Sequence, residues 1–154
     1  MDLPVKTSAL TIGSPAFQNN GSIPARYTCQ GENINPAITI KNIPEGTESL
    51  ALIAEDHDAP GETFVHWIVW NIKPVEIIVD HSYPGVEGRN SFGIPHYRGP
   101  CPPTGEHRYF FKIYALDSML ELEAGSDKEM LLKAMKDHIL AQGELMGKYK
   151  KIRL

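Results

Sequence analysis

The segment Phe64–Ile72, with the sequence FVHWIVWNI, constrains the fold of this chain more than any other stretch. It is dense in aromatic and β-branched residues, which favour strands. Side chains alternate between the two faces of a strand, and apolar residues occupy both faces of this one. Both faces must therefore be covered by other parts of the protein, which predicts a central strand in a sheet that is packed on both sides.

Other short apolar stretches are separated by turn residues, as expected for a β-rich domain. Strands are predicted at residues 9–12, 37–40, 49–55 and 108–117, and turns at residues 18–21 and 44–47. A helix is predicted near the C-terminus, where Ser126 and Glu129 match a capping box. Apolar residues at helical spacing follow, namely Leu131, Leu132, Met135 and Ile139. The sequence thus indicates a mainly β domain with a short helical finish.

Composition limits the classes of protein that this chain can belong to. With 154 residues it is expected to form a single domain over residues 1–154. Its 13 glycines and 12 prolines argue against a helical bundle. A net charge of −4 indicates no general affinity for nucleic acid. No apolar run approaches the roughly 20 residues of a membrane helix, so no integral membrane association is expected.

The sequence constrains the cellular location of the protein and the redox state of its cysteines less strongly. The first six residues lack the pattern of a signal peptide, which favours a cytoplasmic protein. Cys29 and Cys101 would be free thiols in that compartment, although a disulfide between them is also open.

A first cluster of polar residues, Asp56, Asp58 and His66, lies where two predicted strands meet. Asp56 shares its strand face with apolar residues and sits at the start of a loop. A connection of only seven residues leads to the next strand, so the two strands are expected to pair antiparallel and to bring His66 within reach of Asp56. His66 is expected to share its face with Phe64, Ile68 and Trp70. The alternatives are a hydrogen-bonded core histidine and aspartates that cap a turn.

A second cluster begins with Gly99 and runs to Tyr109. His107 and Tyr109 are two residues apart on a predicted strand and therefore point to one face, with Arg108 on the other. Pro103 belongs to a proline-rich loop before them, which can hold backbone N–H groups in place at little entropic cost. Residues 83–105 contain ten of the 25 glycines and prolines, and a loop of this length is usually functional. Arg108 is expected to be structural and to pair with an aspartate.

Both clusters resemble the phosphatidylethanolamine-binding protein family, in its bacterial and archaeal, Raf-kinase-inhibitor-like branch. The resemblance rests on DHDAPGETFVHW at residues 56–67 and YRGPCPPTGEHRYFFKIYALD at residues 97–117. Weaker matches are FQNNGSIPARYTCQGENINP at residues 17–36 and DHILAQGELMGKY at residues 137–149. It implies a mainly β fold with one large and one smaller antiparallel sheet packed together, and short helices near the C-terminus.

The resemblance also implies an anion site at one edge of the large sheet. Its ligand-binding residues would be Asp56, His66, Gly99, Pro103, His107 and Tyr109, with Asp58 and Arg108 in support. Two departures stand out. His57 replaces the proline usual between the two aspartates, and Asn35-Pro36-Ala37 replaces the usual Ser-Pro-Pro.

The first functional hypothesis is a binding protein without enzymatic activity or cofactor. Its ligand would be a small anion or zwitterion such as phosphate or phosphoethanolamine, or a phosphorylated side chain, bound more tightly below about pH 6.5. Asp56 would hold a histidine tautomer or accept from an ammonium group. The resemblance adds a regulatory role with a protein kinase or protease as partner, and a homodimer.

Two enzymatic or metal-binding alternatives stay open. A small hydrolase could use an Asp–His pair as general base, although no nucleophile motif is present. A zinc site could use Asp56, His66 and His107, although these ligands lack the close spacing of known zinc motifs.

Overall fold

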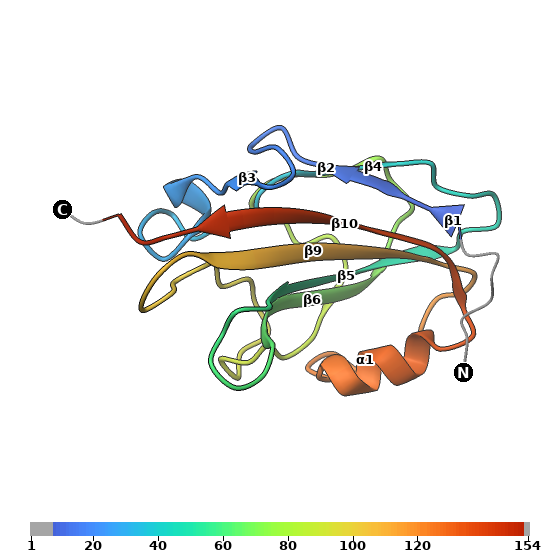
Figure 1. The fold of residues 1–154 in the computed structure, drawn as a ribbon. Helices are drawn as coiled ribbons and strands as arrows, with labels where there is room; N and C mark the ends of the chain where they lie inside the picture. Colours follow the sequence, from blue (N-terminus) through green and yellow to red (C-terminus); the bar gives the residue numbers. More distant parts are fainter. Residues whose placement is uncertain (1–7, 153–154) are drawn as a thin grey trace.

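A computed structural model describes residues 8–152 and contains two β-sheets and one α-helix (Figure 1). The first six residues, in which no signal peptide is predicted, lie outside the described part. The strands are β1 (Ser8–Ala9), β2 (Thr11–Gly13), β3 (Gly21–Ser22), β4 (Ile38–Lys41), β5 (Ser49–Asp56), β6 (Phe64–Ile72), β7 (Ile77–Ile78), β8 (Val86–Glu87), β9 (His107–Leu116) and β10 (Ile139–Tyr149). A 3₁₀ turn, η1, spans Ala25–Tyr27, and the helix α1 spans Lys128–Met135.

The large sheet has the strand order β1-β10-β9-β5-β6-β8, and β3 also pairs with β10. The small sheet has the order β2-β4-β7. Most pairs are antiparallel, and β5 lies between β6 and β9 as its two antiparallel neighbours. The two short strands β1 and β3 run parallel to β10. The expected mainly β fold with one large and one smaller sheet is confirmed, with this small parallel addition.

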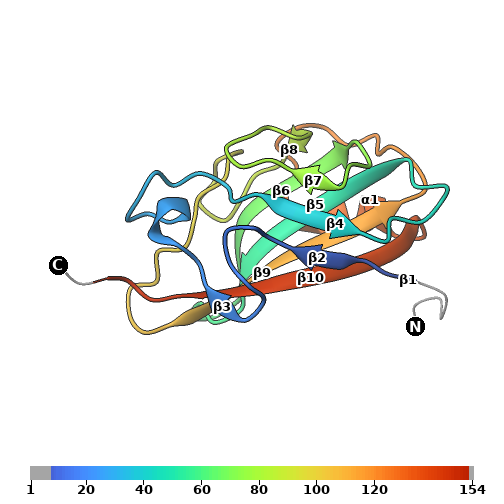
Figure 2. The ribbon, with the colours of Figure 1, turned by 90° about the horizontal axis from the view of Figure 1, so that it is seen from above.

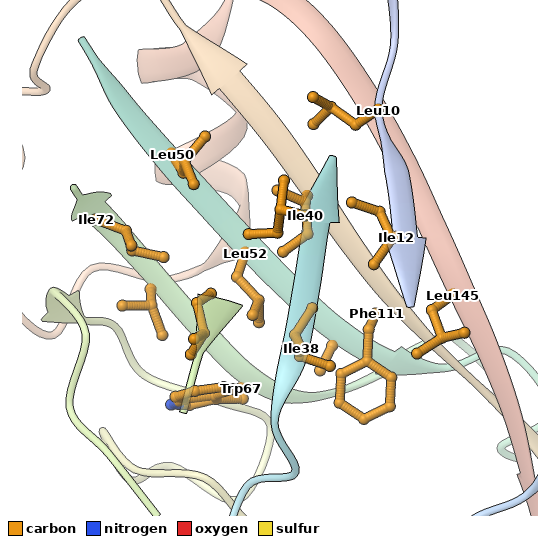
Figure 3. Packing of buried hydrophobic residues seen from close by; sticks show 14 of the residues in the cluster. Leu10, Ile12, Ile38, Ile40, Leu50, Leu52, Trp67, Ile72, Phe111 and Leu145 are labelled. Atoms are coloured by element: carbon orange, nitrogen blue, oxygen red, sulfur yellow. The ribbon is translucent and has the colours of Figure 1, made fainter. Parts of the chain in front are cut away.

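The large sheet is covered on both sides, as the sequence of β6 predicts. The small sheet lies over one face (Figure 2) and α1 lies against the other (Figure 1). Between the sheets, side chains of β2 and β4 such as Ile12 and Ile40 meet Leu52 and Phe111 of the large sheet (Figure 3). Under α1, a second cluster contains Leu131 and Met135 of the helix and Ile53 and Trp70 of the sheet. Burial of each such side chain stabilises the fold by about 1.5–3 kcal/mol.

The C-terminal region differs from its prediction. Within residues 8–152 it contains one helix, α1, instead of the several short helices that the resemblance implies, and the helix is followed by the unpredicted strand β10. The helix ends at Met135, and Ile139, which has helical spacing, is the first residue of β10. The cap is Asp127, whose carboxylate accepts from the backbone N–H of Met130 at 3.0 Å. Ser126, the expected cap, instead donates its hydroxyl to the carbonyl of Glu123 at 2.7 Å. No helix within residues 8–152 has the length and apolar character to span a membrane.

The two glycines of β10, Gly143 and Gly147, allow close packing against the N-terminal segments. A Cβ on Gly143 would lie 2.3 Å from the carbonyl oxygen of Leu10, and one on Gly147 would lie 2.5 Å from the side chain of Ile23. Only glycine allows the N-terminal segments to approach β10 so closely. This requirement explains why a strand of the large sheet carries residues that are poor strand formers.

Candidate functional site

A cavity of about 230 Å³ lies at the end of the large sheet where β5 stops and β6 and β9 begin. The register sets this meeting point, because Asp56 at the end of β5 pairs with Phe64 of β6 and with Tyr109 of β9. The two sequence clusters, about 50 residues apart, therefore converge on one cavity. Its lining comprises Asp56, Ala59, Pro60, Phe64, His66, Phe92, Cys101, Pro102, Pro103, His107 and Tyr109.

Asp56 and His107 form a buried pair at the base of the cavity. His107 Nδ1 lies 2.7 Å from Asp56 Oδ2, and the other carboxylate oxygen accepts from the backbone N–H of Asp58 at 2.7 Å. A carboxylate on Nδ1 fixes the orientation of the imidazole and places a proton on that nitrogen. Asp56 is thus committed to holding a histidine tautomer, the first of its two expected roles, and its partner is His107 rather than His66.

His66 enters the cavity because β6 contains a β-bulge. Ala54 pairs with Trp67, but Glu55 pairs with Val65, so His66 has no partner of its own on β5. The bulge inverts the alternation of β6, as the extra residue of a bulge does. Ile68 and Trp70 therefore face α1, and the expectation that they share a face with His66 is wrong.

The imidazole of His66 is held by the backbone of the long loop. Its Nδ1 lies 2.6 Å from the carbonyl oxygen of Arg98. Burial lowers the pKa of His66 and outweighs the opposite effects of the Arg98 carbonyl and the Asp56 charge. The neutral imidazole is therefore favoured, with its proton on Nδ1.

Tyr109 carries an unpartnered hydroxyl at the same cavity. Its side chain is buried, and its hydroxyl oxygen has no hydrogen-bond partner among the described residues. Burial raises its pKa most, followed by the charge of Asp56, so the hydroxyl keeps its proton at neutral pH. The Asp56 carboxylate and the Cys101 backbone lie close enough to affect this pKa, but neither forms a hydrogen bond of good geometry with the hydroxyl. A buried hydroxyl without a hydrogen bond of good geometry is unfavourable, and Tyr109 is a residue of the cavity lining.

The proline-rich loop closes one side of the cavity and is fastened to the segment around η1. Cys29 and Cys101 form a disulfide, which settles the open question of their pairing in this structure. The backbone N–H of Cys29 also donates to the carbonyl of Pro100 at 3.1 Å. Pro103 lines the cavity as expected. Since Cys101 itself is in the lining, the disulfide fixes one wall of the cavity to the segment around η1.

Gly99 has a packing role and lies outside the cavity lining. A Cβ at this position would lie 2.0 Å from the carbonyl oxygen of Tyr27, so only glycine fits there. Its N–H donates to Asn33 Oδ1 at 2.7 Å. Of the six expected ligand-binding residues, Gly99 is the one that the structure leaves out of the lining.

Asp58 and Arg108 form the expected supporting pair. Two guanidinium nitrogens and the backbone N–H of Arg108 donate to the carboxylate at 2.8–2.9 Å. These hydrogen bonds lower the pKa of Asp58 to about 2. The pair joins the loop after β5 to the start of β9, and so helps to keep Asp56 beside His107.

The family of the chain follows from this site and fold together with direct comparison. A family model described as phosphatidylethanolamine-binding protein matches residues 13–150. The chain belongs to that family. A protein called UPF0098 from Methanothermobacter thermautotrophicus is 43% identical over 150 residues, which cover 92% of this chain and 99% of that protein.

Two solved structures share the fold. One is described as a putative phosphatidylethanolamine-binding protein homologue from Chlamydia trachomatis, with a TM-score of 0.91, 41% identity and coverage of 95% of this chain and 100% of that one. The other is Escherichia coli YbcL, described as a member of the mammalian family, with a TM-score of 0.85, 26% identity and coverage of 94% and 100%.

One family departure, His57, lies away from the cavity. Its ring stacks on Phe110 with centroids 4.0 Å apart, and its Nε2 lies 2.9 Å from Glu55. Glu55 also accepts from Lys112 at 2.8 Å and from Lys128 at 2.6 Å. His57 therefore belongs to a charged cluster on the α1 side of the large sheet.

Sequence reasoning missed most of the apolar lining. Phe92 contacts both Phe64 and His66 through edge-to-face ring packing at 4.9 and 5.5 Å. Nothing in its local sequence separates it from other loop residues; only its place in a long functional loop could have suggested it. The zinc alternative gains no support, because no group of three or more histidine, cysteine or acidic residues within the described chain could hold a metal ion.

Proposed function

We propose that this protein binds a small anion, in the form of a phosphate group on a small molecule or on a side chain. The observation that carries the proposal is the buried, unpartnered hydroxyl of Tyr109 in a cavity that also contains two imidazoles. A bound oxyanion would supply the missing acceptor, and a protonated His107 would add a charged donor. The proposal is compatible with the name of the family.

Titration calorimetry with inorganic phosphate and phosphoethanolamine at about pH 5.5, below the ordinary histidine pKa, tests the proposal. We expect binding by the wild type, weaker binding at higher pH, and loss of binding in His107→Gln. His138→Gln is the matched control, because His138 pairs with Asp117 away from the cavity. Absence of binding heat from folded wild-type protein would contradict the proposal.

A regulatory role follows if the phosphate belongs to a partner. The cavity is too small for more than a head group or a side-chain tip, so the remainder of the ligand would lie outside it. We propose a phosphorylated protein, with a kinase or protease as the expected class. Capture of phosphopeptides by wild type but not by His107→Gln would support this role.

A hydrolase is the second candidate, and the Asp56–His107 pair favours it. His107 has a carboxylate on its Nδ1, and its Nε2 is free to take a proton. This is the arrangement of a general base. The lining offers no serine or threonine hydroxyl, and Cys101 is in a disulfide, so water would have to be the nucleophile. Turnover of a phosphoester and ester panel by wild type and its loss in His107→Gln would establish this activity.

The cytoplasmic location and the homodimer remain proposals. Disulfides persist mainly in oxidising compartments, and in the cytosol of hyperthermophiles, so Cys29–Cys101 restricts where a cytoplasmic assignment would hold. Cell fractionation and analytical ultracentrifugation would decide the two questions separately.

A further inference from the structure

We infer that the cavity selects an anion that still carries a proton, as in a singly protonated phosphate monoester. Anions of the same shape and charge that lack such a proton would be bound more weakly. The inference rests on the proposed anion binding and concerns which anions are accepted. It follows from a count of the hydrogen-bond donors and acceptors that face the cavity.

His66 supplies an acceptor. A backbone carbonyl can only accept, so the contact of 2.6 Å with Arg98 requires a proton on Nδ1 of His66. In the neutral ring the other nitrogen, Nε2, then carries a lone pair. No residue in the described range donates to Nε2, and His66 lines the cavity. A ligand oxygen without a proton would meet this lone pair unfavourably, whereas a P–OH group can donate to it.

The carboxylate of Asp56 strengthens the same preference. It lies 2.7 Å from His107 and in the cavity lining, where it repels any second negative charge. A singly charged ligand is therefore favoured over a doubly charged one. A proton on the ligand reduces its charge and supplies a hydrogen-bond donor at the same time.

The cavity also contains hydrogen-bond donors, so the ligand must also carry oxygens that accept hydrogen bonds. The hydroxyl of Tyr109 makes no hydrogen bond of good geometry within residues 8–152, so a small shift of its side chain would let it donate to a phosphoryl oxygen. His107 holds a proton on Nδ1 towards Asp56, so its Nε2 accepts in the neutral ring, as that of His66 does, and donates only when the ring carries a second proton. The titratable groups of the lining are Asp56, His66, His107 and Tyr109; the loop residues around them are apolar, apart from the disulfide-bonded Cys101.

The need for both a donor and acceptors on the ligand distinguishes phosphate monoesters from phosphate diesters. A monoester can carry both a P–OH group and unprotonated oxygens, whether the ester belongs to a phosphorylated side chain or to free phosphoethanolamine. A phosphodiester, such as the head group of an intact phospholipid, has no P–OH group. The cavity should therefore prefer monoesters to diesters, and diesters should resemble sulfonates in their binding.

Two small anions serve as probes that test the effect of the ligand's proton separately from its shape and charge. Methylphosphonate and methanesulfonate have nearly the same shape, and both are monoanions when the phosphonate is singly protonated, but only the phosphonate has a donor. We expect wild-type protein at about pH 6, just below the ordinary histidine pKa, to bind methylphosphonate about tenfold or more tightly than methanesulfonate. Dimethyl phosphate, which represents a lipid diester, should bind as weakly as methanesulfonate.

Two variants assign the effect to its residue. In His66→Asn the amide nitrogen can still donate to the Arg98 carbonyl, but the amide oxygen is bonded directly to Cγ and does not reach the position of Nε2, so the preference for methylphosphonate should shrink several-fold. Tyr109→Phe removes a donor that serves both probes, so both affinities should fall while their ratio stays constant. Amide NMR spectra of each variant establish that it is folded; if His66→Asn does not fold, the wild-type ratios alone decide.

The outcomes distinguish this inference from the proposed function. Binding of both probes within about threefold of each other would overturn the selection for a proton but leave anion binding in place. Binding of neither probe, nor of inorganic phosphate, would overturn both. Equal binding of methylphosphonate and dimethyl phosphate would also overturn the inference, and would point to a lipid head group as the source of the phosphate.

Discussion

Glu55 and Asp56 are consecutive in β5, but their carboxylates lie on opposite faces of the large sheet. Asp56 faces the cavity and pairs with His107, whereas Glu55 faces α1 and pairs with Lys112, Lys128 and His57. Both residues are buried, Glu55 at 2% and Asp56 at 4% exposure. The alternation of a strand thus separates a carboxylate of the proposed site from one that joins the helix to the sheet.

Substitution of these two neighbours should have different effects. Glu55→Gln leaves Lys112 and Lys128 without their shared carboxylate, and breaking a buried ion pair costs about 3–5 kcal/mol. Asp56→Asn should instead disturb the tautomer of His107 and reduce anion affinity by about tenfold, the effect expected for a lost charge-assisted hydrogen bond. Guanidinium unfolding and phosphate titration of both variants check the contrast. Equal loss of stability in both variants would contradict it.

Stability should fall in acid through the same cluster. Burial by itself would raise the pKa of Glu55, but hydrogen bonds from Lys112, Lys128 and His57 reverse this and hold the pKa at about 2, below its ordinary 4.5. Because the folded protein binds this proton less readily than the unfolded chain, its contribution is complete above pH 4.5 and is lost as the pH falls towards 2. Thermal unfolding of wild type and Glu55→Gln from pH 7 to 3 should show curves that converge in acid. A constant difference between them would argue against this role.

Tyr109→Phe should separate stability from binding. Because the hydroxyl is buried without a partner, its removal should leave the free energy of unfolding unchanged or raise it by about 1 kcal/mol, while anion affinity falls. Tyr97→Phe is the matched control, since Tyr97 donates to the carbonyl of Tyr27 at 2.7 Å and its loss should cost about 1 kcal/mol. Chemical unfolding measures both. A loss of stability in Tyr109→Phe as large as that in Tyr97→Phe would show that its hydroxyl has a partner in the free protein.

Loss of the disulfide should strongly destabilise the protein. Cys29 and Cys101 are 72 residues apart in sequence, and a cross-link over such a loop contributes roughly 4 kcal/mol through the entropy of the unfolded chain. Unfolding midpoints with and without reductant, and for the double variant Cys29→Ala with Cys101→Ala, measure the effect. If a thiol assay on denatured protein that was purified in air without reductant detects two free thiols, the disulfide does not form.

Acid should also destabilise the fold through His66. Burial lowers its pKa, so below the ordinary value of 6.5 the unfolded chain takes up a proton that the folded protein resists. This contribution is complete above pH 6.5 and is lost as the pH falls below it. His66→Asn should therefore lose less stability than wild type between pH 7.5 and 5.5. Parallel loss in both proteins, measured by urea unfolding, would contradict the assignment.

Local sequence determined β4, β5, β6, β9 and the two clusters of polar residues, because side-chain periodicity and turn chemistry act over a few residues. It did not predict the longest strand, β10. The alternation within β9 correctly placed His107 and Tyr109 on one face, since that strand is regular. The same rule failed at His66, where a bulge depends on the pairing of β6 with β5. β10 itself was not predicted, because its glycines, which weaken the strand pattern, reflect contacts with Leu10 and Ile23, more than 120 residues earlier.

The sequence by itself therefore determined the fold class and, through the resemblance, most of the residues that gather at the cavity. Only the tertiary structure decided how they are connected: that Asp56 holds His107, that Arg98 fixes the tautomer of His66, and that Tyr109 has a hydroxyl without a partner. Hydrogen bonds between residues distant in sequence depend on strand register and on the course of the long loop. These are properties of the packed chain as a whole, and no local pattern of residues encodes them.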